Sequence, residues 1–365
     1  MLSDLWNKTF DDFLQEYGLV RCINDPCAYV SKTIDELVIL VLYVDDGLIA
    51  CSSKSKMDSI TTHMNHAFEI TVTDGSYYVG LDIERDRKSK TISIHCYHYI
   101  QRLLSRFRME DCKPCKTPGE AGLRLSKEMV PLSQEEKEEM ERNPYREAVG
   151  SLMYAAYTCR PDIAFNVAQV AQFASCPGIV HWKAVKRIMR YLKGSSRLKI
   201  IYGVEDLHQL TGFVDADFAG EKDNSRWRSM TGLVFALNGG PVVWTSRVQK
   251  TVAISTVAAE FMALKEAVTN CIWLRNLLQE LGFCQDKSTV IHSDNQGAIK
   301  LVLSKELLHR RTKYFAIDIA FVRDQQENRV ISVEYLPTEQ QPVDMLTKSV
   351  SSPSLVNCLK KLDLN

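Results

Sequence analysis

Four acidic residues in the C-terminal half of this 365-residue chain constrain its fold most: Asp215, Glu260, Asp294 and Asp344. Asp215 and Asp294 each follow a short aliphatic, β-branched run that reads as a strand, so we expect each to end a strand. Glu260 and Asp344 fall near the starts of predicted helices. A fold that brings these elements together would gather the four carboxylates at one edge of a sheet. Clustered carboxylates are suited to hold a pair of divalent cations over a phosphodiester.

The segment from residue 208 onward alternates between strand and helix patterns. We expect strands at 210–214, 251–255, 290–293 and 330–335, and a hairpin of 231–237 with 242–246 around an Asn-Gly-Gly-Pro turn. Helices are expected at 257–281, from Gln296, at 312–325 and after Pro342. This order predicts a mixed α/β sheet with helices packed on it.

The N-terminal part carries a second acidic signature, Tyr43-Val44-Asp45-Asp46, in the predicted hairpin 37–51. A helix over 4–17 precedes it, and strands at 77–83 and 91–95 and a helix at 99–107 follow. A stretch rich in Pro, Gly and acidic residues at 110–142 marks a boundary, and 145–193 is strongly helical.

Basic side chains line one face of the helix predicted at 181–193. They are Lys183, Lys186, Arg187 and Arg190, and Arg226, Arg228 and Lys313 add positive charge near the acidic residues. One interpretation is contact with nucleic-acid phosphates, and the alternative is a solvated amphipathic face.

The overall composition limits the kinds of partner and the cellular compartment that we expect for this protein. The chain has 45 basic and 45 acidic residues and therefore no overall basic excess. The longest apolar run, Leu37–Val44, is too short for a membrane span, and no signal layout is visible. Eleven scattered cysteines suit a reducing compartment, so a cytoplasmic or nuclear location is expected. The single Cys112/Cys115 pair is a weak zinc signal, and we expect no zinc site.

Several phrases, in order, resemble the C-terminal part of a copia-type LTR retrotransposon Pol polyprotein. They include Leu-Tyr-Val-Asp-Asp-Gly-Leu-Ile-Ala (42–50), Arg-Pro-Asp-Ile-Ala-Phe (160–165), Asp-Ala-Asp-Phe-Ala-Gly (215–220), Ser-Asp-Asn-Gln-Gly-Ala-Ile (293–299) and Asp-Met-Leu-Thr-Lys (344–348). The resemblance implies an α+β or mixed α/β chain in four parts. These are a reverse transcriptase remnant with a partial polymerase palm (1–118), a helical connection (119–205), a ribonuclease H-like domain (206–350) and a C-terminal tail (351–365).

For the first part, the resemblance implies that Asp45 and Asp46 are a polymerase remnant. The family's third metal-binding aspartate lies on an earlier strand and has no counterpart here, so we expect polymerase activity to be lost unless a partner supplies the missing half.

For the third part, the resemblance implies two Mg²⁺ or Mn²⁺ ions held by Asp215, Glu260, Asp294 and Asp344, and hydrolysis of RNA in RNA–DNA hybrids. The chain departs from the family at Ala258, at 314–317 and at Ala320, while His309 and Lys313 match. An inactive or repurposed relic that binds nucleic acid or protein is the alternative.

Overall fold

The computed structural model describes residues 2–31, 37–123, 125–131, 133–203, 209–221, 227–304 and 314–365. The chain divides into two compact units, Met1–Ile83 with Ile272–Asp286, and Glu84–Cys271 with Lys287–Asn365. No helix in the described ranges combines the length and apolar composition needed to cross a membrane.

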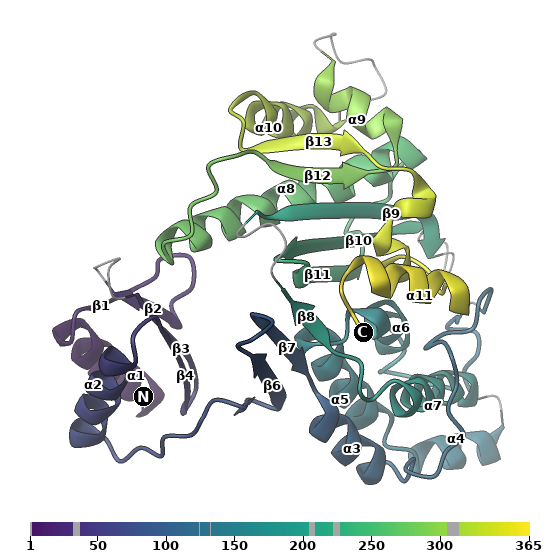
Figure 1. Ribbon diagram of the computed structural model, residues 1–365. Helices are drawn as coiled ribbons and strands as arrows, with labels where there is room; N and C mark the ends of the chain where they lie inside the picture. Colours follow the sequence, from purple (N-terminus) through teal and green to yellow (C-terminus); the bar gives the residue numbers. More distant parts are fainter. Residues whose placement is uncertain are drawn as a thin grey trace. The chain divides into compact units, whose positions relative to one another are not determined.

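The first unit is built on an antiparallel sheet of order β1-β2-β3-β4 with two helices (Figure 1, purple). Its elements are α1 (Leu2–Glu16), β1 (Leu19–Arg21), β2 (Ala28–Ser31), β3 (Val38–Tyr43), β4 (Asp46–Cys51), α2 (Lys54–Ala67) and β5 (Tyr77–Tyr78). Phe10 and Leu14, one turn apart on α1, pack with Leu40 and Ile60 in its core. The predicted N-terminal helix and hairpin are therefore confirmed.

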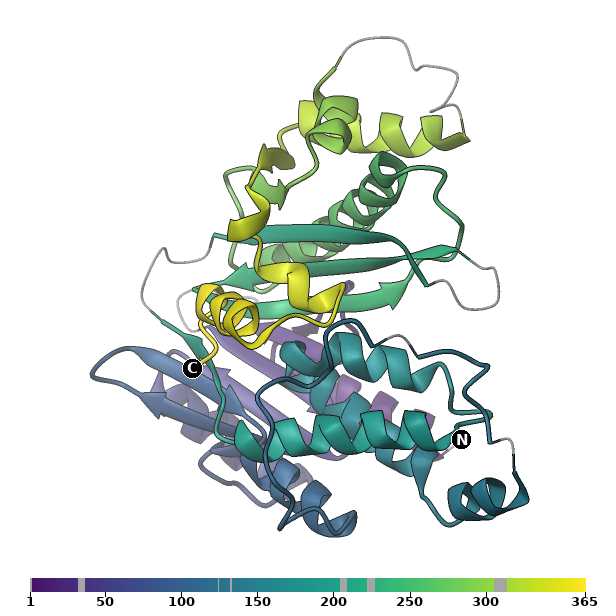
Figure 2. The same cartoon turned by 90° about the vertical axis from the view of Figure 1, so that its right-hand side faces the viewer.

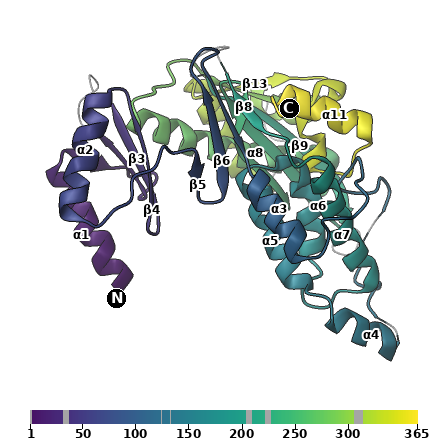
Figure 3. The ribbon, with the colours of Figure 1, turned by 60° about the horizontal axis from the view of Figure 1, so that its bottom comes forward.

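A helical bundle forms one part of the second unit (Figure 3). The elements in this stretch are β6 (Leu81–Asp86), β7 (Thr91–His95), α3 (Tyr97–Arg106), α4 (Gln134–Glu141), α5 (Tyr145–Thr158), η1 (Pro161–Ile163), α6 (Ala164–Ala171), α7 (Ile179–Gly194) and β8 (Ile200–Tyr202). The bundle consists of α3, α5, α6 and α7, and α7 buries the predicted apolar face that includes Val185 and Leu192. Cys96 and Cys159 form a disulfide, which the cysteine pattern did not predict.

A buried charged pair holds the start of this bundle together. Arg160 is fully buried, and its Nε and Nη2 donate to the Asp162 carboxylate at 2.9 and 2.6 Å. Tyr191 of α7 donates to the same carboxylate at 2.7 Å. Because each charge has a partner, the desolvation cost of burial is offset.

A five-stranded mixed sheet forms the other part, in the order β11-β10-β9-β12-β13. Its strands are β9 (Thr211–Glu221), β10 (Arg228–Leu237), β11 (Gly240–Val248), β12 (Thr289–Ser293) and β13 (Ile331–Tyr335). β9, β10 and β11 are antiparallel, whereas β12 runs parallel to both β9 and β13. The accompanying helices are α8 (Thr256–Glu280), α9 (Gln296–Leu303), α10 (Ala316–Glu327), η4 (Thr338–Gln340), η5 (Pro342–Leu346) and α11 (Ser352–Lys361). Figure 2 shows η5 and α11, in yellow, beside this sheet, and η5 contacts β9 and β10. The predicted mixed α/β architecture is confirmed.

Two sequence-based expectations about this sheet are wrong. Asp215 does not end a strand but lies in the middle of β9, because β10 pairs with β9 from Thr211 to Glu221. The expected strand at 251–255 is absent from the described chain, and Val252 and Ile254 there are exposed. Ser255 instead accepts the backbone N–H of Ala258 at the start of α8.

Candidate metal centre

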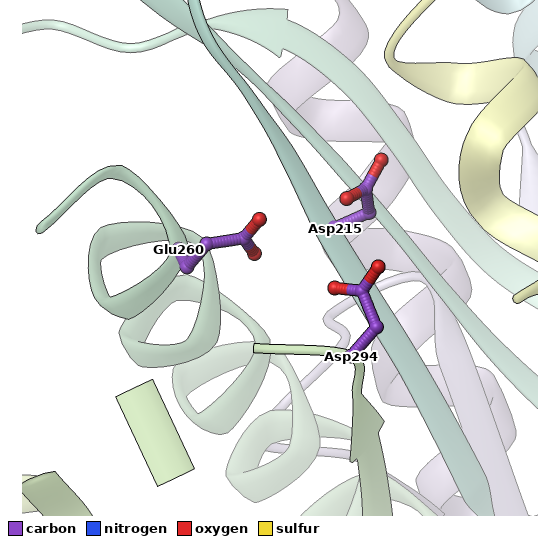
Figure 4. A group of neighbouring side chains, drawn as sticks. All are labelled: Asp215, Glu260 and Asp294. Atoms are coloured by element: carbon purple, nitrogen blue, oxygen red, sulfur yellow. The ribbon is translucent and has the colours of Figure 1, made fainter. Parts of the chain in front are cut away.

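Three of the four predicted carboxylates meet beside β9. Asp215, Glu260 and Asp294 each offer an oxygen, and these oxygens all lie within 4.8 Å of one another. Figure 4 shows Glu260 reaching from its helix toward the two aspartates. In the described chain no other group of three or more acidic, His or Cys side chains has this geometry.

The parallel register of β9 and β12 places the two aspartates side by side. Val214 is opposite Ser293 in this ladder, so the next residues, Asp215 and Asp294, emerge at the same level. Glu260 is the fifth residue of α8, and the backbone N–H of Ala216 on β9 hydrogen-bonds its carboxylate. The site thus combines two neighbouring strands and one helix.

Burial makes the uncompensated negative charge of this group costly. Glu260 is 4% exposed, and burial, followed by the nearby charges of Asp215 and Asp294, raises its pKa to about 9. Burial also raises the pKa of Asp215, to about 6, against the lowering effect of a hydrogen bond from Thr347. Such shifts arise where carboxylates are desolvated together.

The donor set fits a divalent cation. Oε2 of Glu260 is buried without a hydrogen-bond partner in the described structure. Two oxygens on one magnesium ion are at most about 4.2 Å apart, since each bond is about 2.1 Å long. Oxygens already within 4.8 Å need only a small contraction to share an ion.

The segment from η4 to Lys348 supports the aspartates through hydroxyl groups that the sequence patterns did not single out. Thr338 donates to Oδ2 of Asp294 at 2.7 Å, and Thr347 donates to Oδ2 of Asp215 at 2.6 Å. Thr347 lies inside the Asp-Met-Leu-Thr-Lys phrase, which is the one signal that could have pointed to it.

Asp344 is not a member of the group whose oxygens lie within 4.8 Å of one another. It sits in η5, and its Oδ1 forms an ion pair with Nζ of Lys348 at 2.9 Å. Its charge still contributes to the raised pKa of Asp215, so the two carboxylates are neighbours. The structure therefore brings together Asp215, Glu260 and Asp294, and the role of Asp344 as a metal ligand remains a prediction.

The acidic pair of the first unit lies at the β3–β4 turn. Asp45 and Asp46 are exposed, and Val44 before them has φ +58°, an uncommon conformation for a β-branched residue. The two aspartates join no group of three metal-binding side chains within the described residues.

The predicted basic face of α7 is divided between solvent and internal contacts. Lys183 is exposed, and Nζ of Lys186 lies 5.9 Å from the centre of the Trp182 ring. Arg190 donates to the carbonyl of Lys113 at 2.7 Å, and Arg187 donates to a threonine hydroxyl at 3.1 Å, so both hold the preceding segment against the helix.

Of the remaining predicted nucleic-acid contacts, Arg228 is the one that the structure describes. Arg228 starts β10 opposite Glu221. Arg226 and Lys313 lie outside the described residues. The assignment of the seven basic residues to nucleic-acid binding remains a prediction.

A sulfur atom of the Cys112/Cys115 pair is engaged within the protein. The Cys115 thiol lies 3.4 Å from the backbone carbonyls of both Thr117 and Arg187.

Comparisons with known proteins cover nearly the whole chain. Residues 2–121 match the family model of the reverse transcriptase (RNA-dependent DNA polymerase). The chain is 39% identical, over 94% of its length, to the retrovirus-related Pol polyprotein from transposon TNT 1-94 of Nicotiana tabacum, of which it covers 26%. It is 31% identical, over 98% of its length, to the corresponding polyprotein from transposon RE1 of Arabidopsis thaliana, of which it covers 24%.

Among solved structures, the chain resembles LC11-RNase H1, isolated from compost by a metagenomic approach. The identity is 14%, the TM-score is 0.31, and the match covers 38% of this chain and 93% of the other. The chain spans about a quarter of the length of the curated polyproteins it matches. The family match covers the reverse transcriptase part and the similarity to the polyproteins continues through the sheet with the carboxylates, so the chain is similar, over nearly its whole length, to a part of the Pol polyproteins of copia-type retrotransposons.

Proposed function

We propose that the site formed by Asp215, Glu260 and Asp294 cleaves the RNA strand of RNA–DNA hybrids with Mg²⁺ or Mn²⁺. One observation carries this proposal: three carboxylates from two strands and a helix converge within 4.8 Å. We further propose that the chain has the four parts that the family resemblance implies. These are the reverse transcriptase remnant in 1–118, the connection in 119–205, the nuclease in 206–350 and the tail in 351–365.

The side chains of the site are arranged before any substrate arrives. Bound divalent cations supply Lewis acidity and lower the pKa of a water molecule. Thr347 and Thr338 each donate a hydrogen bond to Oδ2 of one aspartate, which holds its carboxylate in place. The Ala216 N–H orients Glu260, whose Oε2 has no partner in the described structure. Because little reorganisation is needed, the group is well placed for electrostatic catalysis.

Asp344 is proposed to contribute to a second cation. It neighbours Asp215, but in this structure its Oδ1 is occupied by Lys348. A set of four carboxylates would match the charge of two divalent ions.

Phosphate contacts along the hybrid are proposed for Lys183 and Lys186, since Arg187 and Arg190 of the same helix are engaged internally. An exposed Lys contributes to binding through its charge and independently of base sequence. Arg226, Arg228 and Lys313 are proposed to make further phosphate contacts.

For the first unit, we propose that residues 1–365 by themselves do not extend a primer. Polymerisation in this family uses three aspartates, and Asp45 and Asp46 provide two. In the described chain before them, Asp25 lies in a turn and accepts the N–H of Cys27. No strand in that part ends in an acidic residue.

Cleavage of a 5′-labelled RNA annealed to DNA, with Mg²⁺ or Mn²⁺, tests the nuclease proposal. Asp294→Asn should abolish cleavage because it removes a carboxylate from the group. Asp324→Asn, an exposed aspartate on α10, is the matched control and should cleave as the wild type does. Equal cleavage by wild type and Asp294→Asn would show that another site or a contaminant acts.

A specific observation favours the alternative of a relic that binds a protein. Tyr314, where the family usually has His, is 66% exposed, and Ile317 is 85% exposed. Large exposed apolar side chains are typical of interaction surfaces. Folded wild-type protein that binds Mn²⁺ and leaves the hybrid intact would support this alternative.

A further inference from the structure

Among the residues that the structure describes, Lys348 is a basic side chain that lies against the carboxylates of the site. Its Nζ lies 2.9 Å from Oδ1 of Asp344, and that pair is half-buried, with side-chain exposures of 47% and 19%. Its backbone N–H also bonds the carbonyl of Asp344 at 3.1 Å, so the chain turn itself holds the pair together.

The same ammonium group acts on more than one carboxylate. Asp215 and Asp217 both interact with Lys348 electrostatically, in addition to Asp344. Lys348 also lowers the proton affinity of Glu260 and Asp215. A positive charge is therefore present within the site before any metal ion is bound.

The four carboxylates then fall into two sets with different partners. Asp215, Glu260 and Asp294 form a compact triangle, with an unpartnered oxygen on Glu260. Asp344 is not a member of this triangle, and its Oδ1 lies 2.9 Å from Nζ of Lys348, although this oxygen also accepts no well-aligned hydrogen bond in the described structure. A second divalent ion near Asp344 would have to compete with Lys348 for the Asp344 carboxylate, and the positive charge of Lys348 would repel it.

We propose that the ammonium of Lys348 stands in for a second divalent cation, so that the substrate-free protein binds one ion, in the Asp215–Glu260–Asp294 triangle. Asp344 is then a positioning residue that keeps Lys348 beside the site, and it becomes a metal ligand only when Lys348 moves away. This inference rests on the proposed metal site but does not depend on cleavage.

Counting bound Mn²⁺ on the full chain tests the inference. Free Mn²⁺ gives a sharp electron paramagnetic resonance signal that disappears on binding, so a titration yields the number of sites and their affinities. Wild type should bind one ion. Lys348→Met should bind two, the second at least on the order of tenfold more tightly than any weak second site of the wild type, because the repelling charge is removed.

Two further variants complete the experiment. Lys265→Met is the matched control, since Lys265 is paired with Asp318 at 3.6 Å on the surface, and it should bind one ion. Asp344→Asn should also bind one ion, with an affinity within about threefold of wild type, because the triangle is intact. This second variant tests the inference even if Lys348→Met does not fold.

The outcomes separate this inference from the proposed nuclease activity. Two equivalent ions on wild type, one ion on folded Lys348→Met, or loss of the ion in Asp344→Asn would each overturn the inference, whether or not the hybrid is cleaved. One ion on wild type and two on Lys348→Met, with no cleavage by either, would support the inference and refute the nuclease. No Mn²⁺ bound by wild type would overturn both.

Discussion

Neutralising Glu260 should stabilise the metal-free protein at neutral pH. Burial and the neighbouring aspartates raise the pKa of this carboxyl from 4.5 to about 9. The unfolded chain therefore releases the proton at a lower pH than the folded chain does. The stability from this group is complete below the unfolded pKa and is lost as pH rises toward the folded value.

The magnitude follows from these two values. A pH of about 7.5 is about three units above the pKa of Glu260 in the unfolded chain, whereas Glu260 in the folded chain is still protonated. At 1.36 kcal/mol per unit, this difference lowers the free energy of unfolding by about 4 kcal/mol. Glu260→Gln, which cannot ionise, should remove this cost. At about pH 5 the advantage of the variant should fall to about 1 kcal/mol, because the unfolded group is then close to its own pKa.

Hydrogen exchange by mass spectrometry, with increasing urea and with EDTA present, measures this effect locally. Peptides from β9 and β10 report on the sheet that carries the site, which avoids treating a chain of two units as one transition. Glu327→Gln, an exposed glutamate on α10, is the control and should change neither stability nor its pH slope. Adding Mg²⁺ should stabilise wild type more than Glu260→Gln. A variant no more stable than wild type at about pH 7.5 would refute the reasoning.

Two further substitutions and one assay test the helical bundle, the carboxylate site and the first unit. Asp162→Asn removes the carboxylate that neutralises buried Arg160 and should destabilise the helical bundle by about 3–5 kcal/mol, read as faster hydrogen exchange in α7; unchanged exchange would contradict the role of the pair. Thr347→Val removes the hydroxyl bound to Asp215 and should lower hybrid cleavage about tenfold to hundredfold without unfolding the sheet, whereas undiminished cleavage would argue against a positioning role. Purified protein should give no primer extension on an RNA template, and extension that disappears with Asp45→Asn would show that the palm remnant is active.

Local patterns predicted most of the secondary structure. The period of apolar residues correctly indicated α1 and the buried face of α7, and the turn residues located the β3–β4 and β10–β11 hairpins. These features depend on residues a few positions apart, so a single sequence contains the information. The strand at 251–255 was expected because its β-branched residues favour extended backbone. It does not form, since none of the described strands pairs with this segment.

Pairing between distant strands decided where Asp215 lies. The acidic, small residues after Val214 resemble a turn, yet β10 continues the ladder past them to Glu221. A strand ends where its partner stops pairing, and a local pattern does not contain that partner.

The sequence by itself determined which carboxylates were candidates and which alternation of strands and helices would carry them. Only the tertiary structure decided which of them meet and what holds each one. The register of β9 with β12 aligned Asp215 with Asp294. The turn of η5 instead placed Asp344 in an ion pair with Lys348. Likewise, Arg187 and Arg190 of α7, which the sequence suggested as phosphate contacts, donate hydrogen bonds to a segment about 70 residues earlier in the chain. The physical reason is that hydrogen bonds and ion pairs form between groups that lie close in space, and spacing along the chain does not specify those distances.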